Sequence, residues 1–341
     1  MDKLTAQFQQ LVEAAKNIVV IQADNPDGDS LGSALALEEI LGDLGKEIHL
    51  YCGVDIPDYL KHLEGWDRVH KEMPTNFDLS IVVDTSANVL LAKLAESQYR
   101  SWVASRPAVI IDHHSGVACD IPFATVVIND EEAVATSEAI YKIANALKWQ
   151  INLQAKSMIM SAILSDSLGL SSASTTPHTY RVMAALLESG VDRSALDEAR
   201  REMTKMPLSI YTYKAKLISR TRIAANGKLA TVVIPHEEIT TYSPLYNPAP
   251  LIQGDMLQVQ GIEVALVLKQ YPGGKVTGSL RSSAKAPISS AIAKLFGGGG
   301  HVFASGFKIN EKGNTDEVLQ TVEEYVKNHF SPKEETDNAT V

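Results

Sequence analysis

The chain has 341 residues, of which 45% are hydrophobic and 21% charged, and its formal net charge is −10. This length favours two domains, each with enough apolar residues for a core of its own. The acidic balance argues against broad binding to duplex nucleic acid, which needs a basic surface, but it allows a small anionic substrate in a local basic cleft.

Neither targeting nor membrane signals are found. The N-terminus shows no basic segment followed by an apolar run, so it does not read as a signal peptide. No apolar stretch reaches the roughly 18 residues of a membrane span. Two cysteines are too few for a disulfide framework or a cysteine-based zinc site. We therefore expect a cytoplasmic protein with no membrane partner.

The first half alternates apolar, β-branched runs with segments of helical periodicity. Strands are expected at 17–22, 47–52, 79–83, 108–111 and 126–128, and helices at 3–15, 31–44, 135–147 and 153–164. Ser30 is the expected N-cap of the second helix. The alternation predicts an α/β domain over residues 1–185, with a parallel sheet, flanking helices and right-handed crossovers.

The second half changes in texture. Residues 179–206 are helical with a break at Gly190, and 186–215 are expected to form a helical linker. Strands are then expected at 229–234, 262–269 and 275–280, and helices at 288–296 and 315–330. This pattern predicts a second, smaller α/β domain over 216–330, followed by a polar tail at 331–341 that frays.

Carboxylates and imidazoles follow four apolar, strand-like runs of the first half. In a parallel sheet, ligands collect at the carboxyl ends of the strands. Carboxylate oxygens and imidazole nitrogens bind hard divalent metals, and several strand ends that bring them together suit a two-metal phosphoester hydrolase. The clusters are Asp27 with Asp29, then Asp84, then Asp112-His113-His114, and finally Asp166.

Most of these clusters have a plain alternative. Asp27 and Asp29 could belong to a polar turn that caps a helix, or diverge from an extended turn toward different cations. Asp84 could be another cap or bridge two cations. The histidine pair is more specific, since one imidazole can ligate a metal while the other hydrogen-bonds a phosphate, and Asp112 can orient an imidazole.

A second signal is the glycine run 297–300, which His301 follows. Glycines expose backbone N–H groups that can wrap a phosphate or let a nucleotide approach closely. His301 adds a donor, and Arg281, at a strand end, could form a fork with phosphate oxygens. The alternatives are a flexible linker for the glycines and a solvated surface charge for Arg281.

Three motifs together resemble the DHH/DHHA1 phosphoesterase superfamily: Asn-Pro-Asp-Gly-Asp at 25–29, Asp-His-His at 112–114 and Gly-Gly-Gly-Gly-His at 297–301. The resemblance spans about residues 5 to 330. Within this superfamily, the chain more closely resembles the oligoribonuclease and pAp-phosphatase group and the phosphodiesterases that finish the degradation of cyclic dinucleotides. It implies a DHH domain with two manganese ions, a smaller DHHA1 domain with a mixed sheet that closes over the substrate, and a possible homodimer.

Carried over by position, the resemblance implies roles for individual residues. Asp27 and Asp84 would hold one manganese ion. The second would be held by Asp29, Asp84, His113 and Asp166, with Asp84 bridging. Catalysis would use Asp84 and His113 together with His114, which would contact the scissile phosphate. The substrate phosphate or its terminal nucleotide would be bound by Arg281, Gly298, Gly299, Gly300 and His301.

The chain departs from the family pattern at Ala23. The first motif of the family usually reads His-x-x-x-Asp-x-Asp, and the histidine position, four before Asp27, is alanine here. Alanine cannot ligate a cation, so the site beside Ala23 is expected to bind its ion weakly. Gln22, Asp24 or water are the candidate substitutes.

The resemblance implies a manganese-dependent phosphodiesterase that acts on short RNA oligonucleotides or on linear dinucleotides such as pApA. The 3′-phosphate of pAp and cyclic di-AMP are further candidate substrates. Pyrophosphatases with a different second domain, and longer exonucleases that bind long single strands, fit less well. A different class is a nucleotide-sensing module without turnover, which Ala23 favours. The presence of Asp27, Asp29, Asp84, His113 and Asp166 argues against it.

Overall fold

The computed structural model describes residues 2–116, 118–243, 246–311 and 313–331. The chain divides into two compact units, Met1–Lys205 and Met206–Val341. The boundary between the units lies within the segment 186–215 that was expected to be a helical linker. Helix α8 (Arg193–Met203) therefore belongs to the first unit and α9 (Leu208–Ser219) to the second. The polar tail expected at 331–341 lies outside the described residues except for Ser331.

Over its described residues, unit 1 contains a six-stranded parallel sheet in the order β3-β2-β1-β4-β5-β6. The fold class expected for the first domain is therefore confirmed. The strands are β1 (Asn17–Ile21), β2 (Glu47–Tyr51), β3 (Val69–His70), β4 (Leu79–Val83), β5 (Ala108–Asp112) and β6 (Val126–Asn129). Three of them, β1, β4 and β5, are nearly continuous runs of buried residues, which is typical of a sheet covered on both faces.

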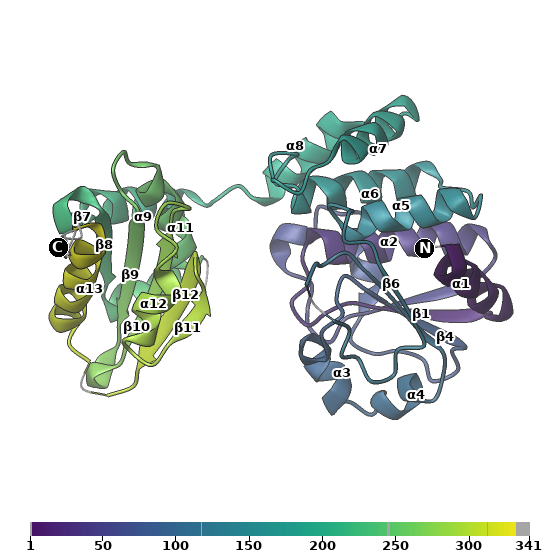
Figure 1. The fold of residues 1–341 in the computed structure, drawn as a ribbon, viewed down its shortest axis with the longest axis horizontal. Coiled ribbons are helices and arrows are strands. Elements are labelled where there is room, and N and C mark those ends of the chain that lie inside the picture. Colours follow the sequence, from purple (N-terminus) through teal and green to yellow (C-terminus); the bar gives the residue numbers. More distant parts are fainter. Residues whose placement is uncertain (1, 117, 244–245, 312, 332–341) are drawn as a thin grey trace, which may run out of the picture. The chain divides into compact units, whose positions relative to one another are not determined.

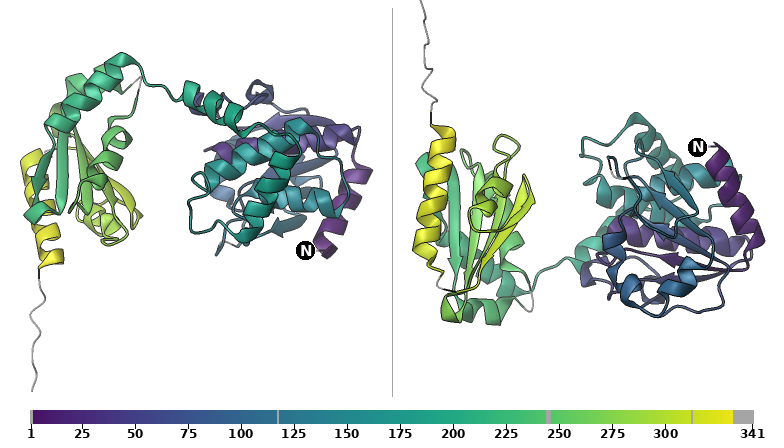
Figure 2. Two further views of the ribbon diagram at one scale, coloured as in Figure 1. Left: turned by 90° about the horizontal axis from the view of Figure 1, so that it is seen from above. Right: turned by 60° about the horizontal axis from the view of Figure 1, so that its bottom comes forward.

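Helices cover both faces of this sheet (Figure 1, Figure 2). One core cluster joins alternate strand residues such as Val20 and Ile81 to α1, α2, α5 and α6. The opposite cluster joins Val19 and Val82 to the short helices α3 and α4. The bounds are α1 (Asp2–Ala14), α2 (Gly28–Asp43), α3 (Ala92–Glu96), α4 (Arg100–Ala104), α5 (Thr136–Ala146), α6 (Leu153–Asp166) and α7 (Pro177–Glu188). None of the helices in the described part of the chain combines the length and apolar character needed to cross a bilayer.

The strand order places a topological switch point between β1 and β4. From β1 the chain proceeds outward to β2 and β3, and then returns to the other side of β1 to continue through β4, β5 and β6. Strands on the two sides connect in opposite directions, which leaves a crevice at their carboxyl ends where α/β proteins bind ligands. Asp27 follows β1 and Asp84 follows β4, so these two expected ligands flank the crevice.

Unit 2 contains a six-stranded mixed sheet in the order β11-β12-β10-β9-β8-β7, as described residues show it. Only the β8–β9 pair is parallel. One face packs on α12 and α13, and the other on α9, α10 and α11. The bounds are β7 (Arg222–Ala224), β8 (Leu229–Ile234), β9 (Val264–Gln270), β10 (Val276–Ser282), β11 (Gly299–His301), β12 (Ala304–Ile309), α10 (His236–Tyr242), α11 (Pro248–Gln258), α12 (Ser289–Lys294) and α13 (Thr315–Phe330).

Candidate active site

The turn after β1 carries the first two carboxylates on a helix N-terminus. Asp27 is the N-cap of α2, and its Oδ1 accepts hydrogen bonds from the backbone N–H groups of Asp29 and Ser30, both at 3.0 Å. The expectation that Ser30 caps this helix was therefore wrong. The carboxylate of Asp27 reaches two orphan donors of the first turn and is the stronger acceptor. Asp29 lies inside α2 rather than in an extended turn.

Asp29 is buried and held by the start of α5. Its Oδ2 accepts from the backbone N–H of Thr136 at 2.6 Å, and its Oδ1 from that of Ser137 at 3.1 Å. The hydroxyl of Ser33 donates to Oδ1 at 3.1 Å. Two N–H groups at a helix N-terminus favour a charged carboxylate. The sequence offered no signal for Thr136 and Ser137 as supports, because they lie more than 100 residues from Asp29.

Asp84 turns sharply out of the end of β4. Its φ is 62°, a left-handed conformation that few residues other than glycine, asparagine and aspartate adopt easily. The hydroxyl of Thr136 donates to Asp84 Oδ1 at 3.1 Å. Burial raises the pKa of the Asp84 carboxyl well above its ordinary value, and the nearby charges of Asp29 and Asp27 raise it further.

His113 brings the carboxylates together. Its Nε2 lies 3.8 Å from Asp29 Oδ2, 3.6 Å from Asp84 Oδ1 and 3.5 Å from Asp166 Oδ2. On the other side of the ring, Nδ1 lies 3.3 Å from the carbonyl oxygen of Ala133, which places the proton on Nδ1. Nε2 is buried, and no hydrogen-bond partner for it occurs among the described residues. Nε2 therefore faces three carboxylates and is free to bind a cation.

Asp166 reaches this cluster from a helix. It is the last residue of α6, which confirms the helix expected at 153–164, so the run before Asp166 is not strand-like as the other three are. Its pKa is raised by burial and then by the charge of Asp29. The C-terminal end of a helix is itself partly negative, which adds to the cost of a carboxylate at this position. A cation bound between these groups would offset both costs.

Asp112 and His114 form a separate pair at the end of β5. Asp112 Oδ1 accepts from His114 Nδ1 and from the backbone N–H of His113, each at 2.8 Å. Asp112 is buried, whereas the His114 side chain is 54% exposed. The hydrogen bond to Asp112 raises the pKa of His114, and the bond to His114 contributes to lowering the pKa of Asp112 against the effect of burial. This pairing favours a protonated imidazole at the mouth of the cluster.

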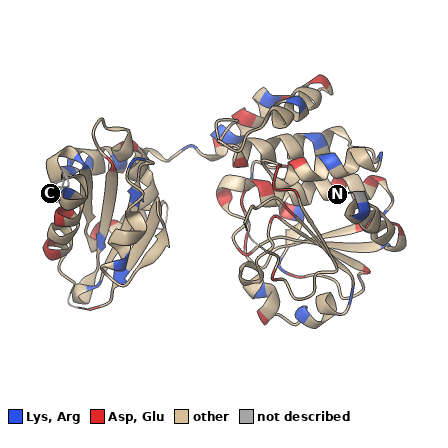
Figure 3. Ribbon diagram, viewed as in Figure 1, with Lys and Arg blue, Asp and Glu red and all other residues tan. Residues whose placement is uncertain are grey.

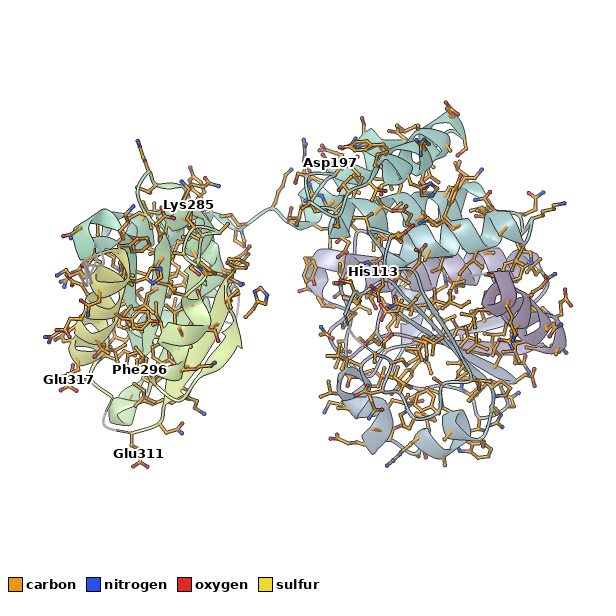
Figure 4. All side chains as sticks on the ribbon, in the orientation of Figure 1. His113, Asp197, Lys285, Phe296, Glu311 and Glu317 are labelled. Atoms are coloured by element: carbon orange, nitrogen blue, oxygen red, sulfur yellow. The ribbon has the colours of Figure 1, made fainter. Side chains whose placement is uncertain are left out.

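The side chains fit a divalent metal centre. The ligand atoms of two groups lie within 4.8 Å of one another: Asp29 with His113 and Asp166, and Asp84 with His113 and His114. Oxygen ligands with one imidazole suit hard divalent cations such as Mn²⁺. His113 Nε2 and the closely spaced carboxylates would supply the ligand atoms, and the cation would offset the repulsion between the carboxylates. Figure 4 labels His113 within unit 1.

The two residues next to Ala23 differ in whether their side-chain oxygens are already hydrogen-bonded. Asp24 already accepts a hydrogen bond from the backbone N–H of Lys93 at 2.8 Å, so it has a structural role. The side chain of Gln22 is fully buried, and neither its oxygen nor its nitrogen has a hydrogen-bond partner within the described parts of the chain. Of the two side chains considered as substitutes for the missing imidazole, Gln22 is the one whose oxygen accepts no hydrogen bond among the described residues.

The expected substrate-binding residues of unit 2 lie on one sheet edge. Arg281 on β10 pairs with Ala304 on β12, and Ala304 pairs with His301 on β11. Directly opposed residues of antiparallel strands point to the same face, so the methyl group of Ala304 separates an arginine from a histidine. Both of these side chains are exposed.

The glycine run is only partly a loop. Gly297 has a left-handed φ of 71°, and the N–H of Gly298 donates to the carbonyl of Ala293 at the end of α12. Gly299 and Gly300 continue into β11 with His301. Among the described strands β11 is at the edge of the sheet. Its outward N–H and C=O groups have no partner strand among the described residues.

Comparisons with known proteins agree with this arrangement. The model of the DHH family, N-terminal domain, matches residues 17–165, and the model of the DHHA1 domain matches residues 249–328. The first match contains Asp27, Asp29, Asp84 and the histidine pair, and ends just before Asp166. The second contains Arg281 and the glycine run.

Individual relatives extend over nearly the whole chain. The bifunctional oligoribonuclease and PAP phosphatase NrnA of Thermus thermophilus is 27% identical over 335 residues, which cover 96% of this chain and 94% of the relative. The protein of the same name from Bacillus subtilis is 24% identical, with 92% and 95% covered. The crystal structure of an exopolyphosphatase-related protein from Bacteroides fragilis matches with a TM-score of 0.80 at 22% identity, covering 96% of this chain and 97% of that one. This last likeness shows the fold.

Proposed function

Because the chain belongs to the DHH/DHHA1 phosphoesterase superfamily, we propose that it is a manganese-dependent phosphodiesterase of short RNA oligonucleotides and linear dinucleotides such as pApA. The observation that carries the proposal is the meeting of three carboxylates around the buried Nε2 of His113, at 3.5 to 3.8 Å. The names of the Thermus and Bacillus relatives support the substrate class.

The metal ligands of the proposed enzyme are Asp27, Asp29, Asp84, His113 and Asp166. Divalent cations, when bound there, supply a nucleophile at neutral pH and neutralise charge on the phosphate. Hydrolysis forms a bond from a water oxygen to phosphorus and breaks the bond to the ribose oxygen, which gains a proton. The protein keeps its ligands aligned through Thr136 and Ser137, which fix Asp29 and Asp84 before substrate arrives.

His114 is suited to hold the scissile phosphate. Its Nδ1 is hydrogen-bonded to Asp112, which leaves Nε2 of a half-exposed ring for the substrate. Because the pKa of His114 is raised, the ring keeps its positive charge up to a higher pH than a free imidazole does. A charged donor interacts strongly with a phosphate oxygen.

Unit 2 contributes the second set of contacts. Arg281 offers a planar fork to phosphate oxygens, and His301 adds a donor on the same face of the sheet. The edge of β11 presents backbone N–H groups close to these side chains. This face is proposed to bind the terminal phosphate or nucleotide of the substrate. The same chemistry extends to pAp and to cyclic di-AMP.

Ala23 supports a second candidate, a nucleotide sensor without turnover. The chain lacks the usual imidazole at that position. The experiment that separates the two follows pApA by chromatography with increasing Mn²⁺, for the wild type and for His113→Ala. The control is His329→Ala, which removes an exposed histidine of α13.

The expected result is conversion of pApA to AMP by the wild type and by His329→Ala. His113→Ala is expected to lose turnover because three carboxylates lose their shared imidazole. Turnover by His113→Ala at the wild-type rate contradicts the proposed centre. Tight binding of pApA without hydrolysis at every Mn²⁺ concentration identifies the sensor instead.

A further inference from the structure

A cavity of about 570 Å³ lies in unit 1 next to the carboxylate cluster. It is bordered by the short helix η1 (Asp58–Leu60), the end of α6 and helix α8. One wall contains Gly28, which lies between Asp27 and Asp29 in the chain, and Ser165, which precedes Asp166. The metal ligands and this wall therefore share the same two helix ends.

The wall is formed by close packing. A Cβ atom added to Gly28 would lie 2.3 Å from the hydroxyl oxygen of Ser165, so α2 and α6 touch there. Tyr59, on the opposite border, has its hydroxyl 3.5 Å from the carbonyl oxygen of Pro26. Pro26 directly precedes Asp27 in the chain, so this border of the cavity also lies next to the turn that carries the first expected metal ligand. A molecule in the cavity therefore lies beside the expected cations.

The lining combines an apolar surface with positive charge. Arg193 and Arg200 project from α8, one on each side of Asp197. Asp197 pairs with Arg200 at 2.7 Å and with Arg201 at 2.6 Å, and no ion pair of Arg193 occurs among the described residues. Figure 3 shows both signs of charge along α7 and α8, and Figure 4 labels Asp197. The apolar lining consists of Leu60, Leu63, Leu164, Leu168 and Leu196.

His62 adds a hydrogen-bond acceptor. Its Nδ1 lies 2.8 Å from the carbonyl oxygen of Tyr59 and donates to it, so Nε2 carries the lone pair. Burial, and then the charge of Arg200, lower the pKa of His62. A neutral imidazole in the lining can accept a hydrogen bond from an N–H group, such as the exocyclic amine of a base.

We propose that this cavity is a nucleoside subsite that receives the base and ribose of the nucleotide adjoining the scissile phosphate. The inference rests on the proposed function and adds the location of one half of its substrate. The volume lies within the roughly 300–1,000 Å³ of small-molecule sites. An inorganic phosphate would satisfy the arginines but leave the leucine surface uncovered, whereas a nucleotide supplies an apolar base, hydroxyl groups and an anion together.

The test fills the cavity without altering a metal ligand. Leu196→Trp adds bulk to the lining, and Ala195→Trp adds the same side chain to an exposed position of α8 that does not line the cavity. Hydrolysis of pApA and of methyl p-nitrophenyl phosphate, which has no nucleoside, is measured with Mn²⁺. Calorimetric binding of pApA to each protein is measured in parallel.

For Leu196→Trp we expect KM for pApA to rise about tenfold or more, the equivalent of about 1.4 kcal/mol of binding, with kcat nearly unchanged. Cleavage of the small ester and all properties of Ala195→Trp should match the wild type. Unchanged KM and binding of pApA in Leu196→Trp would overturn the subsite.

The proposed function fails in a different way. If the wild type cleaves neither ester with Mn²⁺, hydrolysis is excluded, and calorimetry then decides on the cavity alone. Loss of pApA binding in Leu196→Trp but not in Ala195→Trp would still support a nucleoside subsite. Equal binding by all three proteins, or none by the wild type, would reject it.

Discussion

At Asp84, an asparagine can replace the charge without disturbing the left-handed backbone. Asparagine adopts the same φ of 62° with little strain and keeps an oxygen for the hydroxyl of Thr136. Asp84→Asn should therefore fold normally. It removes one of several carboxylates that repel each other across His113, so the metal-free variant is expected to melt at a higher temperature than the metal-free wild type.

Thermal unfolding with and without Mn²⁺ checks this expectation. The wild type should gain stability from Mn²⁺ by mass action, and Asp84→Asn should gain far less because the proposed bridging ligand is lost. Asp67→Asn, which neutralises an exposed carboxylate elsewhere in unit 1, should behave as the wild type. An equal gain from Mn²⁺ in both variants would remove Asp84 from the ligand set.

At Ala23 a possible metal ligand can be added, whereas the substitution at Asp84 removes one. Ala23→His restores the imidazole usual in the family at a buried position after β1. It is expected to tighten Mn²⁺ binding by about tenfold or more, in line with the 10–100-fold effects of changes around metal ligands. Calorimetric titration measures the dissociation constant. Ala23→Leu adds comparable bulk without a ligand atom, and the two variants should differ; identical affinities would mean that position 23 faces no cation.

At the scale of elements, the crossing of α2 and α6 sets the site. A Cβ atom at Gly32 would lie 2.8 Å from the Cβ of Ala162 and 3.0 Å from the carbonyl oxygen of Met158. Gly32→Ala should therefore push the helices apart and cost about 1–3 kcal/mol, as overpacked cores do. Urea unfolding gives the free energy, and weaker Mn²⁺ binding should accompany it because Asp29 and Asp166 separate.

The same helix provides the control. Gly42 has no atom within 4 Å of its added Cβ and is near the end of α2. Gly42→Ala should stabilise the protein by about 0.5–1 kcal/mol, because alanine has the higher helix propensity. If both substitutions stabilise to the same extent, the helices are not in contact at Gly32.

In unit 2, a charge pair joins α9 to α10. The guanidinium of Arg220, which caps α9, donates to both oxygens of Glu238 and lowers its pKa. A carboxylate with a lowered pKa stabilises the fold above its ordinary pKa near 4.5, and this stability is lost as the pH falls through the lowered value. Glu238→Gln should therefore lower the melting temperature at pH 7 and have less effect at pH 3.5.

The control is Glu237→Gln, on the exposed side of α10, which should have little effect on the melting temperature at either pH. A loss of melting temperature in Glu238→Gln that is the same at both pH values would contradict the pairing.

The length of each element decided how much of the fold and of the candidate site the sequence could predict. The buried runs of β1, β4 and β5 were long and apolar, so the aspartates and histidines after them could be located at one sheet edge. The strands β3 and β11 have two and three residues, too few for a recognisable period. Asp166 was identified, but on a helix, because a short apolar run fits either element. The cavity could not be foreseen, since η1, α6 and α8 form it only in three dimensions.

At the scale of the whole molecule, each unit has its own core, which predicts that the units fold separately. Residues 1–205 alone should bind Mn²⁺ as the full chain does, because every proposed ligand lies there. Their kcat/KM for pApA should fall by at least about tenfold, since Arg281 and His301 are missing. Calorimetry and chromatography measure the two quantities. Undiminished kcat/KM in the fragment would exclude unit 2 from substrate binding.

Position 28 constrains the molecule from two directions. A methyl group there would collide with Ser165, and both residues line the cavity proposed for a nucleoside. A change in substrate preference is therefore expected to come through η1 or α8, which contain none of the proposed metal ligands. Substitutions in η1 and α8 can then alter the cavity while the ends of α2 and α6 keep the proposed metal ligands in place.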